Sequence, residues 1–200
     1  MHFIIITRCY KPTNLEKVKE SIKVAFFGSQ HTYTHLLIVD LTHGGKRKDF
    51  IKFADDTSVM YFVSKKQAND QHLDIAMDLI LTEFDQDDAY VFFVDDDNIM
   101  HPDFLQICKH CSGEDALVFK IEGRPNFGNP DALHGQAVGH IDWANFIVKL
   151  GMMKRVQIYH GGNRSNCEDS IFFNKMEAQP DCKIKFVDKV LAYYNKLPKP

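Results

Sequence analysis

Short apolar runs alternate along the first half of the chain with segments whose apolar residues recur at helical spacing. The run at residues 2–7 is nearly continuous, which is typical of a strand buried on both faces of a sheet. Further strands are predicted at residues 35–41, 58–63 and 89–94. Helical spacing links Leu15, Val18, Ile22 and Ala25 in one interval, and Leu73, Ala76, Ile80 and Phe84 in another. This alternation predicts a single-domain α/β fold, with a mostly parallel central sheet and helices on both faces.

Residues that start or stop helices place some of the element ends. Thr13 stands three residues before Glu16, which predicts a capping box, and Gly28 can close the same helix in a left-handed conformation. Pro102 predicts the start of a short helix that reaches about residue 111. The second half is less regular: we expect a strand at 116–121, a helix at 167–178 and a strand at 183–187. A Gly-, Asn- and Pro-rich loop is expected over 123–139, and a loop of that length is usually functional or mobile.

Composition and charge argue against several classes of protein. The formal net charge is -3 and Lys and Arg are spread throughout, so we expect no nucleic-acid partner, and no apolar run is long enough for a membrane span. The N-terminal apolar run is too short for a signal peptide, and the five cysteines lack framework spacing, so we expect reduced thiols and a cytoplasmic protein. Cys108 and Cys111 form a lone CxxC without further ligands at zinc-site spacing, so we expect ordinary thiols there.

Asp95, Asp96 and Asp97 directly follow the most apolar strand predicted in the chain. Open parallel sheets bind ligands at the carboxyl ends of their strands. If the strand continues, Asp95 and Asp97 share one face, and two hard oxygen donors there suit Mg²⁺ or Mn²⁺ bridging a diphosphate. A charge run is usually a solvated turn. Because three like charges here adjoin a buried strand, we interpret them as a metal–diphosphate site.

Other phosphate and calcium motifs do not fit the sequence. An EF-hand starting at Asp95 would need glycine at the position of Met100 and glutamate at that of Gln106. Residues 43–48 lack the Walker A order and are interpreted as a polar loop. No GxGxxG follows the first strand, which argues against a dinucleotide oxidoreductase.

Glu168 and Asp169 begin a predicted helix after a Gly-rich stretch that starts at Gly161. Acidic residues at this position are often explained by the helix dipole alone. In a fold that also carries a metal-type acidic cluster, they become candidates for a general base.

Together these segments resemble the GT-A fold of nucleotide-sugar glycosyltransferases, especially the inverting family-2 type in its small, single-domain form. The resemblance covers nearly the whole chain. IIITRCYKP is similar to the first strand and donor loop, LLIVDL to the second strand, FFVDDDN to the DxD motif, HPDFL to the helix after it and CEDSIFF to the ED motif. It implies a GT-A domain over residues 1–195, with a nucleotide-binding half at 1–98, an acceptor and catalytic half at 99–195, and a tail or linker at 196–200 that could lead to further domains.

The resemblance also implies a donor site. Thr7, Cys9 and Tyr10 would line the nucleoside pocket, and Asp40 would hydrogen-bond the uracil ring of a UDP-sugar.

At the two acidic motifs, the resemblance implies a metal site and a base. Asp95 and Asp96 would face the donor, with Asp95 on the ribose or the metal, and Asp97 would ligate Mn²⁺ or Mg²⁺. Asp169 would be the base, with Glu168 beside it. Two features depart from the family: the Arg-Asn pair usual before DxD is not recognisable, and no histidine follows the ED motif. His160 could replace that histidine or be an ordinary loop residue.

Trp143, the only tryptophan, could stack on an acceptor sugar with Asp142 nearby, or could pack in the core. The preferred function is metal-dependent, inverting transfer from a UDP-sugar to a hydroxyl of a carbohydrate or glycoconjugate. One alternative is a sugar-nucleotide pyrophosphorylase, which should carry a Gly-rich loop after the first strand, where TRCYKP has no glycine. The other is a non-catalytic nucleotide- or carbohydrate-binding module.

Overall fold

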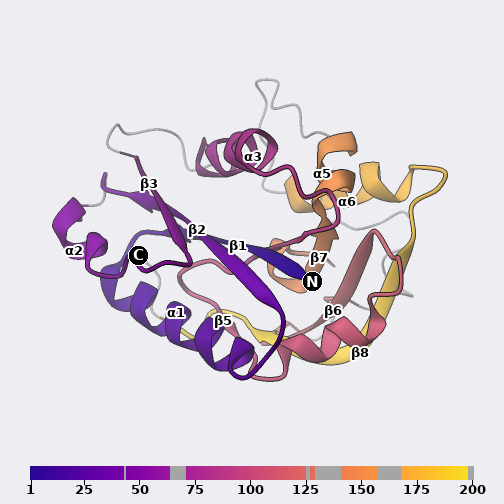
Figure 1. Cartoon of the computed structure of the whole chain (residues 1–200), viewed down its shortest axis with the longest axis horizontal. Helices are drawn as coiled ribbons and strands as arrows, with labels where there is room; N and C mark the ends of the chain where they lie inside the picture. Colours follow the sequence, from indigo (N-terminus) through magenta and orange to yellow (C-terminus); the bar gives the residue numbers. More distant parts are fainter. Residues whose placement is uncertain (43, 64–70, 125–126, 129–140, 157–167, 198–200) are drawn as a thin grey trace.

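Four parallel strands from the first half of the chain form one side of an eight-stranded sheet (Figure 1). The computed structural model describes residues 1–42, 44–63, 71–124, 127–128, 141–156 and 168–197. β1 (His2–Cys9) pairs with β2 (Thr32–Asp40) and with β4 (Tyr90–Phe93), and β2 pairs with β3 (Ser58–Val63). Because all four run in the same direction, their carboxyl ends meet at one edge of the sheet.

The other side of the sheet mixes strand directions. β7 (Phe146–Lys149) is antiparallel to both β4 and β6 (Ala116–Glu122). β8 (Ile184–Tyr193) runs parallel to β6, and β5 (Ile99–Met100) is antiparallel to β8, which gives the strand order β3-β2-β1-β4-β7-β6-β8-β5. β6 and β8 therefore end, and β7 begins, at the edge where β1, β2 and β4 end.

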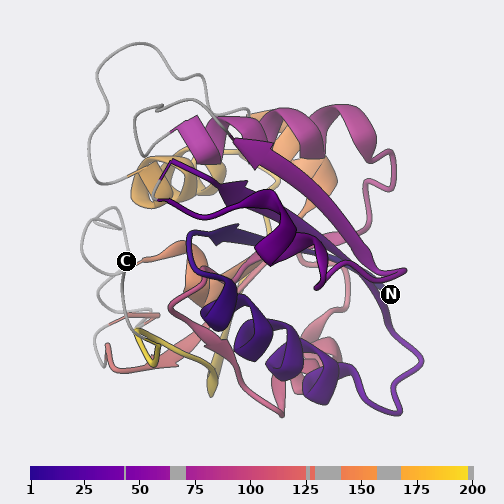
Figure 2. The ribbon, with the colours of Figure 1, turned by 90° about the vertical axis from the view of Figure 1, so that its left-hand side faces the viewer.

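Helices cover both faces of the sheet, as the sequence predicts. α1 (Pro12–Phe26) and the 3₁₀ helix η1 (Phe104–His110) lie on one face, and α3 (Gln71–Glu83), α5 (Leu150–Val156) and α6 (Glu168–Glu177) lie on the other (Figure 2). Strand alternation sends Phe3 and Ile5 of β1 towards α1, and Ile4 and Ile6 into the core under α3 and α6. The predicted α/β fold with a mostly parallel sheet is confirmed.

Several element ends differ from the prediction. α1 begins at Pro12 without a side-chain cap, because proline fits the first helical position, so Thr13 lies inside the helix and the predicted capping box is wrong. Gly28 has φ of 68° after α1, as predicted. A short helix, α2 (Arg47–Ile51), starts within the segment expected to be a polar loop. The helix expected after Pro102 is the 3₁₀ helix η1.

The sequence pattern did not reveal β5, β7, α5 or the 3₁₀ helix η2 (Trp143–Asn145), and β8 continues past the expected end at residue 187. β7 runs directly into α5, and Gly151 lies inside the helix rather than between the two elements, so no turn segment separates them. Asp188 and Lys189 interrupt the apolar pattern of β8, but both side chains are exposed, so the strand continues through them.

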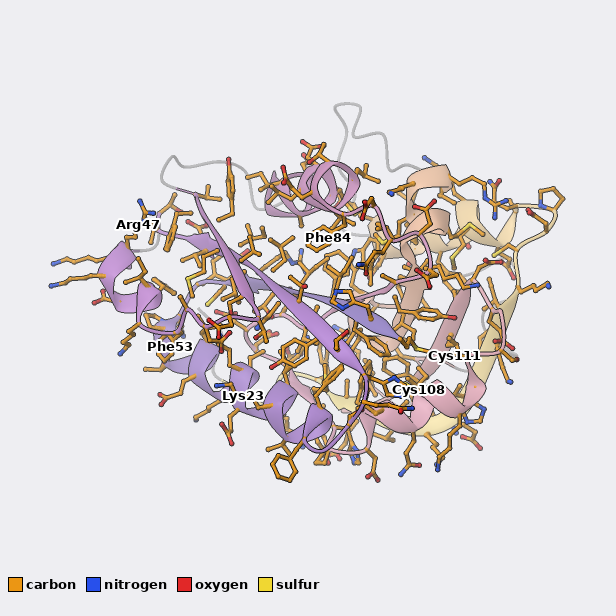
Figure 3. All side chains as sticks on the ribbon, viewed as in Figure 1. Lys23, Arg47, Phe53, Phe84, Cys108 and Cys111 are labelled. Carbon is orange, nitrogen blue, oxygen red and sulfur yellow. The ribbon has the colours of Figure 1, made fainter. Side chains whose placement is uncertain are left out.

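Two further sequence expectations concern thiols and membranes. Cys108 and Cys111 lie close together at η1 as free, half-buried thiols packed against the core on the α1 face (Figure 3). Within the described residues, no helix combines the length and apolar character that crossing a bilayer requires.

Candidate active site

The three consecutive aspartates form a turn at the end of β4. The amide of Val94 still donates to the Ile6 carbonyl (2.8 Å), but the amide of Asn98 donates back to the Asp95 carbonyl (3.0 Å). The condition that the strand continues through the aspartates is not met, since β4 ends at Phe93, although the Asp96 amide still donates to the Arg8 carbonyl (3.3 Å). Asp95 and Asp97 are half-buried while Asp96 is buried. The two outer carboxylates of this turn are therefore more exposed than the middle one.

Asp96 fixes the loop between β1 and α1. Its Oδ2 accepts hydrogen bonds from the amides of Tyr10 (2.7 Å) and Lys11 (2.9 Å). Burial raises the pKa of Asp96 to about 6; these hydrogen bonds oppose the shift, and the charges of Asp95 and Asp97 add to it. The middle aspartate thus holds the loop that the resemblance assigns to the donor.

A buried hydrogen-bond chain lies beneath this turn. The hydroxyl of Thr7 donates its one hydrogen to the Val94 carbonyl (2.7 Å), so the Nε2 of His35 must donate to Thr7 Oγ1 (2.9 Å). Burial, with the charge of Lys19, lowers the pKa of His35 to about 3, which keeps its ring neutral. Thr7 and Cys9 are both fully buried, so the structure places these two predicted pocket residues behind the edge of the sheet.

Tyr10 and Asp40 occupy the same edge, at the ends of β1 and β2. Asp40 is buried, and its Oδ1 accepts a hydrogen bond from the amide of Thr42 (2.6 Å). Burial raises the pKa of Tyr10 to about 12; the charge of Arg8 opposes this, and those of Asp95 and Asp40 add to it. Tyr10 therefore interacts electrostatically with a carboxylate at the end of β2, Asp40, and with one that follows β4, Asp95.

Asp169 and Asp142 bring two later segments to this cluster. Asp142 caps η2, with its Oδ1 accepting from the Ala144 amide (2.9 Å), and Asp169 lies in the first turn of α6 beside Glu168, accepting from the Ser170 amide (2.7 Å). Burial first and the charge of Asp142 second raise the pKa of Asp169 to about 6.

The charges of these carboxylates also act on one another. Burial raises the pKa of Asp142, and the charge of Asp95 adds to that shift. Arg8 favours the ionised forms of both Asp142 and Asp169. The two acidic motifs, far apart in the sequence, therefore interact electrostatically in one cluster that also contains Arg8.

Two arginines belong to the cluster and were not among the predicted residues. Arg8 pairs with both carboxylate oxygens of Asp95. Arg124 lies 3.7 Å from Asp142 Oδ2, with its guanidinium over the rings of Tyr194 (3.9 Å) and Phe127 (4.5 Å). Arg8 follows Ile4 and Ile6 on the β1 face that α6 covers, a register visible in the sequence, whereas nothing in the sequence pattern marks Arg124.

Trp143 packs in the core. Its ring centroid lies 4.6 Å from that of Phe93, 5.3 Å from Phe146 and 5.1 Å from Phe172, and the residue is 5% exposed. Core packing, one of the two alternatives drawn from the sequence, describes this position. His160 and residues 161–167, which precede Glu168 in the sequence, lie outside the described residues.

A cavity of about 640 Å³ lies elsewhere, between α1 and the β5–β8 pair. It is lined by Glu16, Lys17, Glu20, Ser21, Val24, Ile99, Met100, Pro102 and Tyr193. None of the clustered carboxylates lines it. Because ligands bind at the carboxyl ends of parallel strands in open α/β sheets, we place the candidate chemistry at the cluster.

Neither protein-family models nor curated proteins match this sequence. Solved structures do match its fold. S. aureus TarS 1–349 in complex with UDP aligns with a TM-score of 0.69 and 17% identity, over 96% of this chain and 60% of that one. The chain covers 37% of a longer S. aureus TarS structure, so it spans only part of TarS.

Two other solved structures extend the likeness. The mannosyltransferase PcManGT from Pyrobaculum calidifontis, in complex with GDP-Man and Mn²⁺, gives a TM-score of 0.66 at 12% identity over 98% of this chain and 57% of that one. The 4-diphosphocytidyl-2C-methyl-D-erythritol synthase from Anaerococcus prevotii gives 0.60 at 12% identity over 99% and 90%. The likeness confirms the GT-A fold that the sequence predicts.

Proposed function

We propose that this chain is a glycosyltransferase that moves a sugar from a UDP-sugar to an acceptor hydroxyl with inversion of configuration. The observation that carries the proposal is that Asp169, with a pKa raised to about 6, and Asp95 both interact with Asp142 and Arg8 at the ligand-binding edge of a GT-A fold. The UDP complex of TarS and the GDP-Man complex of PcManGT support a nucleotide-sugar donor.

The reaction needs a base because a sugar hydroxyl is a poor nucleophile. In the proposed step, Asp169 accepts the hydroxyl proton while the oxygen bonds to the anomeric carbon and the bond to the diphosphate breaks. A pKa of about 6 leaves Asp169 mostly ionised at neutral pH, yet more basic than an exposed aspartate. Burial first and the charge of Asp142 second raise this pKa, and the Ser170 hydrogen bonds and the charge of Arg8 oppose them.

A divalent cation fits this site only in partnership with a diphosphate. Within the described ranges, no group of three His, Cys, Asp or Glu side chains could hold a metal ion. In nucleotide sites, Mg²⁺ is usually held by one or two carboxylates together with substrate phosphates, and Asp97 and Asp95 supply that set. The cation would supply positive charge to the leaving diphosphate. Mn²⁺ in the PcManGT complex supports this choice.

Asp40 is proposed to accept a hydrogen bond from the uracil N3–H. Asp40→Asn keeps the oxygen that binds the Thr42 amide but replaces the other oxygen with a donor. We expect UDP affinity to fall about tenfold or more, because a buried hydrogen bond left unmade costs ~1–3 kcal/mol. The affinity for CDP, whose N3 is an acceptor, should fall less in the same variant. Calorimetry with both nucleotides measures the difference, and an equal loss for UDP and CDP would exclude this role.

The function itself is tested by incubating the chain with a panel of UDP- and GDP-sugars, Mn²⁺ and carbohydrate acceptors. Release of the nucleoside diphosphate with formation of a glycoside supports the proposal. The synthase of the same fold keeps the pyrophosphorylase alternative open, and formation of pyrophosphate from a sugar phosphate and a nucleoside triphosphate would favour it. Stabilisation by nucleotide sugars without turnover of any of them would favour a binding module.

A further inference from the structure

Arg8 occupies both oxygens of the first carboxylate in the DDDN turn. Its Nε donates to Asp95 Oδ1 at 2.7 Å, and a terminal guanidinium nitrogen donates to Oδ2. The two side chains are 23% and 26% exposed. Paired, charge-assisted hydrogen bonds of this kind are the strongest side-chain contacts that a carboxylate makes in proteins.

The guanidinium is a permanent positive charge in this cluster. Burial disfavours the charged form, but Asp95 reverses this and raises the pKa of Arg8. The same positive charge opposes the rise in the pKa values of Asp142 and Asp169. An arginine does not lose its proton in a protein, so only movement of the side chain can take this charge away from Asp95.

A divalent cation and this guanidinium compete for the same atoms. The cation site would use Asp97 and Asp95, two residues apart in one turn. With both oxygens of Asp95 engaged by Arg8, a cation arriving alone must break a bidentate ion pair before Asp95 can bind it. A diphosphate changes this balance, because its oxygens also match the guanidinium fork and give Arg8 another partner.

We propose that Arg8 is an internal counter-ion that prevents Asp95 from binding a divalent cation until a nucleoside diphosphate is present, so that metal and nucleotide bind as one unit. This inference rests on the proposed function, since it concerns the same site. Arg8 acts here as a positioning residue, through Asp95. Because coupling between two ligands is reciprocal, the metal should tighten nucleotide binding by the factor with which the nucleotide tightens metal binding.

The test measures free Mn²⁺ by electron paramagnetic resonance during titrations with and without UDP. The natural chain should bind Mn²⁺ weakly alone and much more tightly with UDP. Arg8→Gln should bind Mn²⁺ alone at least tenfold more tightly than the natural chain, because the competing ion pair is gone. The factor by which UDP tightens Mn²⁺ binding should shrink at least tenfold in the same variant.

Two control variants separate competition from a general change in charge. Arg155→Gln removes another arginine that contacts both oxygens of an aspartate, Asp181, but on the exposed surface of α5. Arg124→Gln removes a second arginine of the cluster, which pairs with Asp142 rather than Asp95. We expect Mn²⁺ affinity without UDP to change less than threefold in both.

A lysine variant covers the possibility that Arg8→Gln does not fold, which circular dichroism would reveal. Arg8→Lys keeps the positive charge but cannot form the two-pronged pair, so its Mn²⁺ affinity without UDP should lie above that of the natural chain.

Unchanged Mn²⁺ affinity in the folded Arg8 variants, or an equal gain in Arg124→Gln, would overturn the inference alone if UDP binding by the natural chain still depends on metal. UDP binding that is indifferent to metal in the natural chain would overturn both the inference and the metal dependence in the proposed function.

Discussion

Asp169→Asn should lower the turnover of the proposed transfer at least a hundredfold while leaving nucleotide-sugar affinity within about threefold. A positioned general base typically contributes ~10²–10⁴-fold, and an amide cannot accept the proton. The asparagine Oδ1 can still accept from the Ser170 amide, so the first turn of α6 should remain in place. Single-turnover kinetics with a radiolabelled donor, together with calorimetry of UDP, would separate the loss of chemistry from a loss of binding.

Glu168→Gln is the matched control for this variant. It removes the same charge from the adjacent residue, which points about 100° away on the helix, so only one of the two can face the anomeric carbon. We expect the turnover of Glu168→Gln to fall by less than tenfold. Transfer with retained configuration, seen by NMR of the product, or a near-normal rate for Asp169→Asn would refute the assignment of Asp169.

The raised pKa of Asp169 predicts a specific pH dependence. The base must be ionised, so kcat/KM should fall as the pH drops through about 6. Asp142 is the carboxylate whose charge holds this pKa up, and Arg8 opposes it. Asp142→Asn should therefore move the acid limb of the kcat/KM profile to lower pH. A limb that stays at the same pH in this variant would show that Asp169 does not produce it.

The contribution of Asp169 to the free energy of unfolding should depend on pH in the opposite direction from kcat/KM. A carboxyl group whose pKa is higher in the folded than in the unfolded chain binds more protons when folded between pH 4 and 6. Its contribution to the free energy of unfolding therefore falls as the pH rises through that window. Asp169→Asn removes this dependence, which makes the variant a sound tool at neutral pH because its expected effect on stability there is not destabilising.

The sequence predicted the parts of the fold that local pattern controls. Ile4 and Ile6 belong to an apolar run that could only be a buried strand, and Gly28 stands where α1 needs a left-handed residue. β7 was missed because Phe146 to Lys149 run directly into α5 with no turn segment between them, so only pairing with β4 and β6 defines the strand. Its antiparallel direction is a tertiary property that no local signal carries.

In the candidate site, too, the sequence showed what local pattern controls but not what depends on tertiary contacts. Consecutive carboxylates after β4 are visible in the sequence, and so is the acidic start of α6. The sequence could not show that Asp96 would turn inward to bind the Tyr10 and Lys11 amides, because that depends on where the β1–α1 loop passes. Nor could it show Arg124 against Asp142, since the contact joins the end of β6 to the residue before η2.

The second large effect that we expect is the metal dependence of turnover and of UDP binding, which we assign to Asp97. In EDTA, turnover by the natural chain should fall by about a thousandfold, since a cation at a leaving diphosphate typically contributes several kcal/mol. UDP should bind the natural chain far more tightly with Mn²⁺ than with EDTA, and Asp97→Asn should abolish that difference. The turn should survive the substitution, because backbone hydrogen bonds hold it: the Asn98 amide donates to the Asp95 carbonyl (3.0 Å) and the Leu197 amide to the Asp97 carbonyl (3.1 Å).

A nearby aspartate provides the control for this prediction. Asp103 is exposed and makes no side-chain cap at η1, so Asp103→Asn changes the net charge equally without touching the turn. We expect this variant to keep the full metal dependence of UDP binding, measured by calorimetry. If Asp97→Asn retains that dependence as well, the cation is not held by Asp97. Asp95 would then have to hold it alone, although Arg8 engages both of its oxygens.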